Sequence, residues 1–287
     1  KCGCARIMFN RKSRKPFGVF IAGKQGDLIF ALPVVKALQR KHGMVRLITS
    51  PLCVPLVPVL WEQPFLKDRI EVDERPYAIT NNVTSPWYEF PKGQQGINLS
   101  IRPEWIEQRK CWTTLAAEVA GVELTESDYI ALPSLIAHRA WYYSQLVHGK
   151  DGTPTGQMHP NTVVLAPEAE TMPMLAMAVW QELAKALSKW FQVLIVGLKP
   201  DDSFAGHTDL RGLTTVASMA KILAESRMVI SALSLPFHLA RHSGVPNFLL
   251  SDTYEYHSFP VDTYYIAYTS KQLKDVVETG RRIAQYK

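Results

Sequence analysis

Short apolar runs separated by turn-forming residues recur along the chain, and the first of them form one structural unit. Residues 17–22 are apolar and predict a buried parallel strand. A Gly-Lys-Gln-Gly turn follows at 23–26, then apolar residues at helical spacing as far as Gly43 and a second strand at 45–49. A strand, turn, helix and strand in this order require a parallel sheet.

The start of this first helix carries two special residues. Asp27 stands where a helix N-cap is expected, because its carboxylate can accept from free N–H groups. Pro33 lacks an N–H, so we expect either an irregular first turn or a regular helix that begins near Ala31.

The pattern weakens between residues 51 and 147 and then restarts. The first half continues with a strand at 69–72 and a helix at 109–122 that ends at the Gly121 signal. Turn formers fill residues 148–161 and predict a domain linker. Beyond it we expect strands at 162–166, 191–197, 228–231 and 246–250, and helices at 177–190, 216–225 and 237–242.

This order predicts an α/β protein of two Rossmann-like domains, residues 1–155 and 156–287, facing across a cleft. The 287 residues suit two domains, and 47% hydrophobic with 20% charged residues is typical of a globular chain. Ligands of such folds bind at the carboxyl ends of strands, so the cleft is the expected site.

The positive charge is concentrated at one end of the sequence. Residues 1–15 contain six basic residues and no acid: Lys1, Arg6, Arg11, Lys12, Arg14 and Lys15. Of the 32 basic residues this leaves 26, which balance the 26 acidic ones, so the net charge of +6 lies in this basic arm. Such an arm binds a phosphate-rich partner, either nucleic acid or an anionic membrane surface, or it is a solvated tail.

Two further observations concern location and metal. No apolar run reaches the 18 to 20 or so residues that span a bilayer, and no secretory signal follows the basic residues, so we expect a cytoplasmic protein, either free or peripheral at the inner membrane surface. The four cysteines are scattered, and Cys2-Gly-Cys4 has no second pair at zinc spacing. We expect free thiols and no metal site.

Four segments together resemble the heptosyltransferase family of GT-B glycosyltransferases, in the order and spacing that the family shows. They are Gly26-Asp-Leu-Ile-Phe-Ala-Leu-Pro with the Ala-Leu that follows, residues 112–122, Asp209-Leu-Arg-Gly-Leu-Thr-Thr, and Ser234-Leu-Pro-Phe-His-Leu-Ala with Gly244-Val-Pro. The resemblance implies a GT-B fold and inverting, metal-independent transfer of a sugar from a nucleotide-sugar donor to an acceptor hydroxyl of a saccharide or lipopolysaccharide.

The chain departs from the family at the expected donor site. Leu233 and Leu235 stand where family members usually carry Asp and Gly, and residues 168–180 contain no Lys or Arg. These departures leave the donor nucleotide and its sugar open.

The resemblance makes Asp27 the general base that takes the proton of the acceptor hydroxyl. Gly26 allows a ligand close to the backbone, and Lys24 is a candidate for an anionic acceptor or a phosphate. From the residues alone, an ordinary N-cap is the favoured interpretation of Asp27, and Lys24 is equally well explained as a solvated turn lysine.

Ser234, Pro236 and His238 open a predicted helix, whose N–H groups and dipole suit a departing nucleotide diphosphate. Glu168 and Thr171, in the loop after the 162–166 strand, are further donor-binding candidates. The alternative for His238 is a core residue with satisfied contacts.

Other chemistries are not supported. Residues 23–26 match neither the dinucleotide fingerprint nor a P-loop, and the adjacent Asp201 and Asp202 are not the Asp-x-Asp of metal-dependent transferases. Besides transfer to a saccharide, two alternatives remain: transfer to hydroxymethylated bases of DNA, which the basic arm would suit, or a non-catalytic nucleotide-sugar-binding protein of the same fold.

Overall fold

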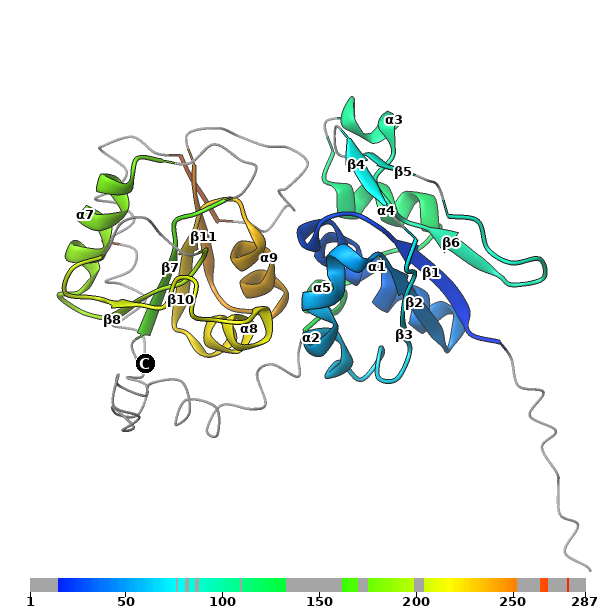
Figure 1. The fold of residues 1–287 in the computed structure, drawn as a ribbon, viewed down its shortest axis with the longest axis horizontal. Coiled ribbons are helices and arrows are strands. Elements are labelled where there is room, and N and C mark those ends of the chain that lie inside the picture. The colour runs from blue at the N-terminus through cyan, green and yellow to red at the C-terminus, as the bar shows by residue number, and fades with distance from the viewer. Residues whose placement is uncertain are drawn as a thin grey trace, which may run out of the picture.

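The computed structural model describes residues 15–75, 77–80, 83–85, 88–108, 110–132, 162–169, 175–198, 204–251, 264–267 and 278. The predicted linker, Thr171 and the basic arm, apart from Lys15, lie outside these residues. The domain boundary at 155/156 therefore stays a prediction. Most of the described strands form two separate parallel sheets (Figure 1), as the sequence predicts.

The first sheet has the strand order β3-β2-β1-β6, and all its pairs are parallel. Its strands are β1 (Phe17–Ile21), β2 (Val45–Thr49), β3 (Ile70–Val72) and β6 (Gly96–Asn98). An antiparallel pair, β4 (Ala78–Thr80) and β5 (Val83–Ser85), stands apart from this sheet. The chain leaves β1 on one side to reach β2 and lies on the other side at β6, so the gap between β1 and β6 is a topological switch point.

The second sheet has the order β12-β11-β10-β7-β8-β9 and is parallel throughout. Its strands are β7 (Thr162–Ala166), β8 (Gln192–Ile195), β9 (Thr208–Asp209), β10 (Met228–Ser231), β11 (Asn247–Ser251) and β12 (Tyr264–Ala267). Counted from β7, this is the 3-2-1-4-5-6 order of a dinucleotide-binding fold. The switch point lies between β7 and β10, where the Ala232 N–H donates to the Ala166 carbonyl at 2.8 Å.

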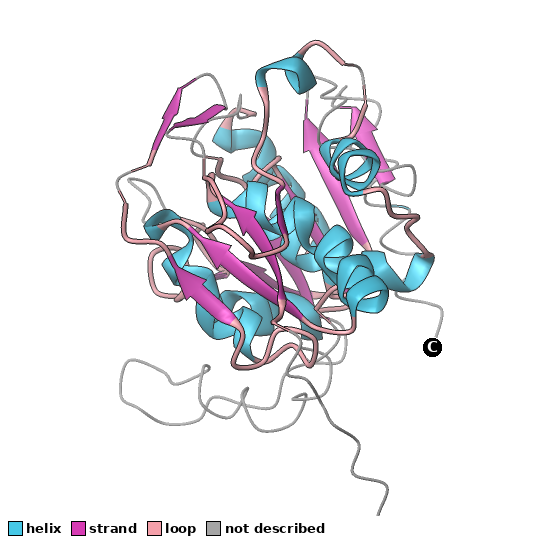
Figure 2. Cartoon of the chain, turned by 90° about the vertical axis from the view of Figure 1, so that its right-hand side faces the viewer, coloured by secondary structure: helices cyan, strands magenta, loops and turns pink. Residues whose placement is uncertain are grey.

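Helices pack beside both sheets (Figure 2). In the first half they are α1 (Gln25–His42), the 3-10 helix η1 (Pro51–Leu56), α2 (Val57–Trp61), α3 (Pro103–Ile106), α4 (Trp112–Ala120) and α5 (Glu126–Tyr129). In the second half they are α7 (Met177–Leu187), α8 (Val216–Glu225) and α9 (Leu235–His242). The predicted bounds of α8, and the end of α4 at Gly121 in left-handed conformation, are confirmed.

Helix α1 corrects two predictions. It begins at Gln25, before the expected start near Ala31, and its N-cap is Lys24, so Asp27 is the third helical residue rather than the cap. Pro33 is accommodated inside the helix. In the same turn, the Thr113 hydroxyl of α4 donates to the Phe30 carbonyl at 2.8 Å. This bond ties α4 to α1, whereas the carbonyl that Pro33 leaves without a helical N–H is that of Ile29.

The two halves share one apolar core. A single cluster of buried side chains includes Leu28 and Leu32 of α1 together with Leu239 and Ala240 of α9. Helix α8 also contacts η1 and α2. The burial of apolar surface therefore continues from the first sheet to the second, which holds the two units against each other.

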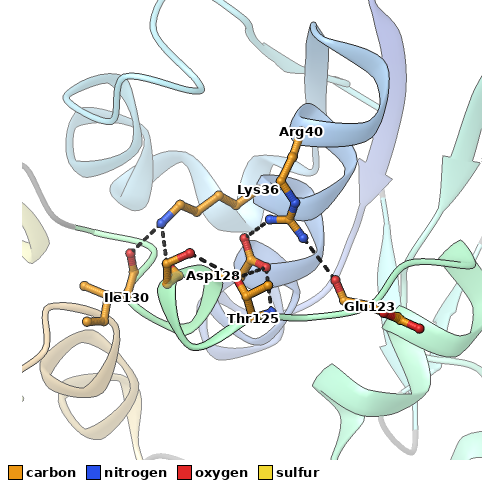
Figure 3. A network of polar contacts seen from close by, with 7 residues as sticks. Lys36, Arg40, Glu123, Thr125, Asp128 and Ile130 are labelled. Atoms are coloured by element: carbon orange, nitrogen blue, oxygen red, sulfur yellow. Dashed lines mark hydrogen bonds and ion pairs between the residues drawn. The ribbon is translucent and has the colours of Figure 1, made fainter.

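Residues 121–132 connect the two halves at the far end of α1 from Asp27. On one side, Lys36 donates to the Ser127 and Ile130 carbonyls, and Arg40 pairs with Asp128 at 2.5 Å (Figure 3). On the other side, His242 Nδ1 donates to the Tyr129 carbonyl at 2.8 Å, and the Leu132 N–H donates to the His242 carbonyl at 2.9 Å. We call residues 121–132 the strap.

Replacement of the buried Thr113 by Val should lower the free energy of unfolding by about 1 to 2 kcal/mol, because the buried hydrogen bond between α4 and α1 is lost. Thr114→Val is the matched control: Thr114 is exposed in the same helix turn, so its replacement should change stability by less than about 0.5 kcal/mol. Urea unfolding of both variants measures the difference. Equal stabilities would contradict the role given to this bond.

Candidate functional site

The two switch points lie next to each other. Helix α1 starts after β1, and α9 starts after β10, so both begin at the carboxyl edges of their sheets. The rings of Phe30 and His238 are in contact and tilted relative to each other, with their centroids 4.4 Å apart. A Cβ atom on Gly26 would lie 3.7 Å from the His238 ring. The predicted acceptor turn and the predicted donor helix therefore meet at one place.

Asp27 lies in this junction and is partly buried. Its Oδ2 accepts the Lys24 N–H at 2.8 Å. Burial raises the pKa of Asp27 to about 6, against the opposing effects of that hydrogen bond and of the Lys24 charge. At neutral pH the group is mostly a carboxylate, yet it is far more basic than an exposed aspartate. A pKa near the working pH is what general-base catalysis requires.

The turn before Asp27 leaves no room for a side chain at Gly23, since a Cβ atom there would lie 2.6 Å from Asp27 Oδ2. Cys53 of η1 contacts the same turn: its Sγ donates to the Gly23 carbonyl at 3.5 Å. Burial raises the pKa of the Cys53 thiol to about 11, so it stays a neutral donor. From the sequence, Cys53 was expected to be a free thiol. No sequence pattern predicts its contact with the 23–26 turn.

The start of α9 offers fewer backbone donors than the sequence suggests. Helix α9 begins at Leu235, before the predicted start at 237, and its N-cap is Ser234. The Ser234 hydroxyl donates to the Ala232 carbonyl at 3.3 Å and makes no cap bond. Pro236 has no N–H, and the Phe237 N–H already donates to the Ser234 carbonyl at 3.1 Å. A diphosphate-binding site at Ser234 and Pro236 stays a prediction, and it would depend on the other backbone N–H groups of this turn.

His238 is buried, and its ring packs between those of Phe30 and Phe237. Burial lowers the pKa of His238 to about 3, and the nearby Arg241 charge acts in the same direction. The imidazole is neutral at physiological pH, so it cannot neutralise a phosphate, although a neutral N–H can still donate. This geometry favours the packing alternative for His238, and a donor contact stays a prediction.

Glu168 lies at the carboxyl edge of the second sheet in an ionic cluster. Its Oε1 pairs with Arg211 at 2.7 Å, and Arg211 pairs with Asp209 at 2.7 Å as well. The Arg211 side chain is fully buried, and its guanidinium stacks on Phe204 at 4.7 Å. Among the described residues, this cluster joins one cation to two carboxylates. Sequence reasoning missed Arg211, although it belongs to the Asp-Leu-Arg-Gly segment quoted above.

The described residues contain neither a cluster of metal ligands nor a helix that could span a membrane. Within the described ranges, no group of three or more His, Cys, Asp or Glu side chains is placed to hold a metal ion. Among the helices of the described residues, none is both long enough and apolar enough to cross a bilayer.

No family model matches the chain, and no curated protein matches its sequence. Solved structures share its fold. The glycosyl transferase family 9 protein of Veillonella parvula is 12% identical with a TM-score of 0.57, over 94% of this chain and 89% of that one. E. coli heptosyltransferase WaaC with ADP is 12% identical with a TM-score of 0.60, over 92% and 100%. The chain has the GT-B fold. A third GT-B structure, E. coli ADP-heptose lps heptosyltransferase II, is 13% identical with a TM-score of 0.52, over 93% and 98%.

The GT-B fold confirms the predicted class and the structural resemblance to heptosyltransferases. In this chain it brings together Asp27, Gly26 and His238 at the junction, with Ser234 and Pro236 at the start of the same helix as His238. Glu168 is held in a separate ion cluster on the second sheet. The roles of these residues are not tested by similarity of fold.

The two glycines of the 23–26 turn should respond differently to alanine. Gly23→Ala places a methyl group against the Asp27 carboxylate at a positive φ of 155°, and should destabilise the protein by about 1 to 3 kcal/mol. Gly26→Ala meets only an ordinary contact inside α1, and should stabilise it by about 0.5 kcal/mol. Thermal unfolding measures both. Equal losses would show that the turn has a different geometry.

Proposed function

We propose that this protein is a glycosyltransferase that moves a sugar from a nucleotide-sugar donor to an acceptor hydroxyl, with Asp27 as the general base. The single observation that supports it most is Asp27 itself, a carboxylate with a pKa of about 6 at the junction of two Rossmann-like sheets. E. coli WaaC is described with ADP and with ADP-2-deoxy-2-fluoro heptose, which supports a nucleotide-sugar as donor.

In the proposed reaction, Asp27 takes the proton of the acceptor hydroxyl while that oxygen bonds to the anomeric carbon of the donor. The bond from the anomeric carbon to the diphosphate oxygen breaks, and its electron pair leaves with the nucleotide diphosphate. Attack opposite the leaving group inverts the anomeric centre. In this proposal, the charge of Lys24 and the helix dipole at the start of α9, at Ser234, stabilise the departing phosphates.

The donor site differs from that of the family in two physical respects. Leu233 is buried with Phe237 and Leu249, so the position at which the family usually has Asp serves packing here. Glu168 adds negative charge where the family tends to have a basic residue. Both features favour a donor whose sugar and phosphates make different contacts from those of the family.

Thermal shift with a panel of nucleoside diphosphates is the first test, because it separates this proposal from the alternatives without knowledge of the acceptor. A binding nucleotide should raise Tm by mass action, and the matching nucleotide-sugars should then be hydrolysed or transferred. Binding without any turnover would favour the non-catalytic protein. Transfer only in the presence of hydroxymethylated DNA would favour the nucleic-acid acceptor.

Asp27→Asn should lower the rate of transfer by about 10² to 10⁴ while donor affinity is kept. In the wild type, kcat/KM should fall as pH decreases below about 6, because protonated Asp27 cannot accept the proton. Wild-type turnover in the Asn variant would contradict the assignment.

The same variant should be more stable than the wild type at neutral pH. The pKa of Asp27 is raised from 3.8 to about 6 in the folded chain, so its ionisation costs up to about 3 kcal/mol of folding free energy above pH 6. Asn removes this cost, and the gain should disappear below pH 4, where the wild-type carboxyl is also neutral. Denaturant unfolding as a function of pH measures it, and a residue that only caps α1 predicts no gain.

Asp73→Asn is a control for the stability measurement, because it should change the free energy of unfolding in the opposite direction to Asp27→Asn. The hydrogen bond from Arg75 lowers the pKa of Asp73 against the effect of burial, so ionised Asp73 stabilises the folded chain at neutral pH. Its replacement should therefore reduce stability at pH 7, with the difference shrinking as pH falls through the carboxylate range.

A further inference from the structure

The loop after β7 occupies the place at which a sheet of this strand order normally binds a diphosphate. In the order 3-2-1-4-5-6 the diphosphate lies between the end of the first strand, here β7, and the helix that follows it. A glycine-rich turn usually joins the two, because it lets the backbone approach the phosphates. Here residues 167–176 separate β7 from α7, and they contain two glutamates but no Gly, Lys or Arg. The loop therefore lacks the usual means of holding a diphosphate.

Glu168, the second residue after β7, is held in a fixed position. Its Oε1 accepts from Arg211 Nη1 at 2.7 Å. Its Oε2 lies against Gly197, the second residue after β8, where a Cβ atom would come within 2.7 Å of that oxygen. Gly197 also has a positive φ of 149°, which few other residues adopt. The glycine at the end of the neighbouring strand thus leaves the room that the Glu168 carboxylate needs.

The cation of this cluster is shielded from solvent, whereas its carboxylates are not. The Arg211 side chain is fully buried, pairs with Asp209 at 2.7 Å as well, and has its guanidinium over the ring of Phe204. The Glu168 side chain is 13% exposed and that of Asp209 21%. A phosphate that approaches the end of β7 therefore meets negative charge before it meets Arg211.

The other side of the switch point has the opposite character. Strand β10 lies next to β7, with the Ala232 N–H bonded to the Ala166 carbonyl at 2.8 Å. Helix α9 begins three residues further on, at Leu235, and its first turn contains no acidic residue. The helix dipole makes this end positive. A diphosphate at the switch point is thus repelled from the β7 side and attracted to the α9 side.

On the basis of the proposed sugar transfer, we propose that Glu168 is a specificity-determining residue that excludes phosphate from the end of β7. The donor diphosphate then lies against the start of α9, and the end of β7 faces an uncharged, hydroxyl-bearing part of the donor. Glu168 Oε2 has no hydrogen-bond partner among the described residues, and an ionised carboxylate accepts from hydroxyls but repels phosphate.

Calorimetric titration of the full chain with inorganic pyrophosphate and with ADP, at low salt and without acceptor, tests this proposal. Glu168→Gln should bind both ligands at least about tenfold more tightly than the wild type, because a fixed negative charge is removed. The amide oxygen of Gln can still accept from Arg211. The gain should shrink in about 0.5 M salt, since salt screens the repulsion. A residue that only supports the loop predicts weaker or unchanged binding after its replacement.

Glu182→Gln is the matched control, because it removes the same charge from an exposed position of α7. Its affinity for pyrophosphate should stay within about twofold of the wild type, since an exposed charge is screened by solvent and salt. Glu168→Thr is a second test variant, which removes the charge with a smaller side chain and should show the same gain. Thermal unfolding without ligand shows which variants are folded.

Two results would overturn the proposal. The first is a folded Glu168 variant that binds pyrophosphate no better than the wild type, which includes the absence of binding in both. The second is an equal gain in Glu182→Gln, which would reflect net charge alone. Sugar transfer by the wild type together with either result would leave the proposed function standing. A gain in affinity without transfer from any nucleotide-sugar would support the role of Glu168 and contradict the proposed function alone.

Discussion

The apolar junction between α1 and α9 is the contact on which the candidate site depends. Each helix begins at the carboxyl edge of its own sheet, and Phe30 against His238 brings the two edges together. Asp27 is partly buried at the same junction, and this burial raises its pKa. Packing between the two halves therefore also sets the basicity of the group that we assign to catalysis, so a substitution in the junction would change stability and chemistry together.

The sequence predicted the two sheets because parallel strands buried on both sides leave a clear apolar signature. Strands β2 and β7, and helix α8, have the predicted bounds. The start of α1 was wrong, since local rules place a proline outside a helix. Thr113, 83 residues from Phe30, donates its hydroxyl to the Phe30 carbonyl in the turn before Pro33. Such a long-range partner has no local pattern.

The candidate site was predictable in part. Asp27 and the start of α9 were found because glycine turns and a resemblance point to them. Their environments were not, because burial decides the charge of His238 and the pKa of Asp27, and burial depends on how the two halves meet. The pairing of Glu168 with Arg211 joins positions 43 residues apart, at the ends of different strands, and only the strand order brings them together.

The strap has a mechanical consequence. The strap bonds to Lys36 and Arg40 of α1 and to His242 of α9, whereas Asp27 lies at the opposite end of α1. The 13 residues from Asp27 to Arg40 make a lever of about 20 Å. A hinge rotation of about 10° at the strap would swing Asp27 by roughly 3 Å, the full reach of one hydrogen bond. The strap thus joins the two halves at one end of α1, and the contact of Phe30 with His238 joins them near the other end, beside Asp27.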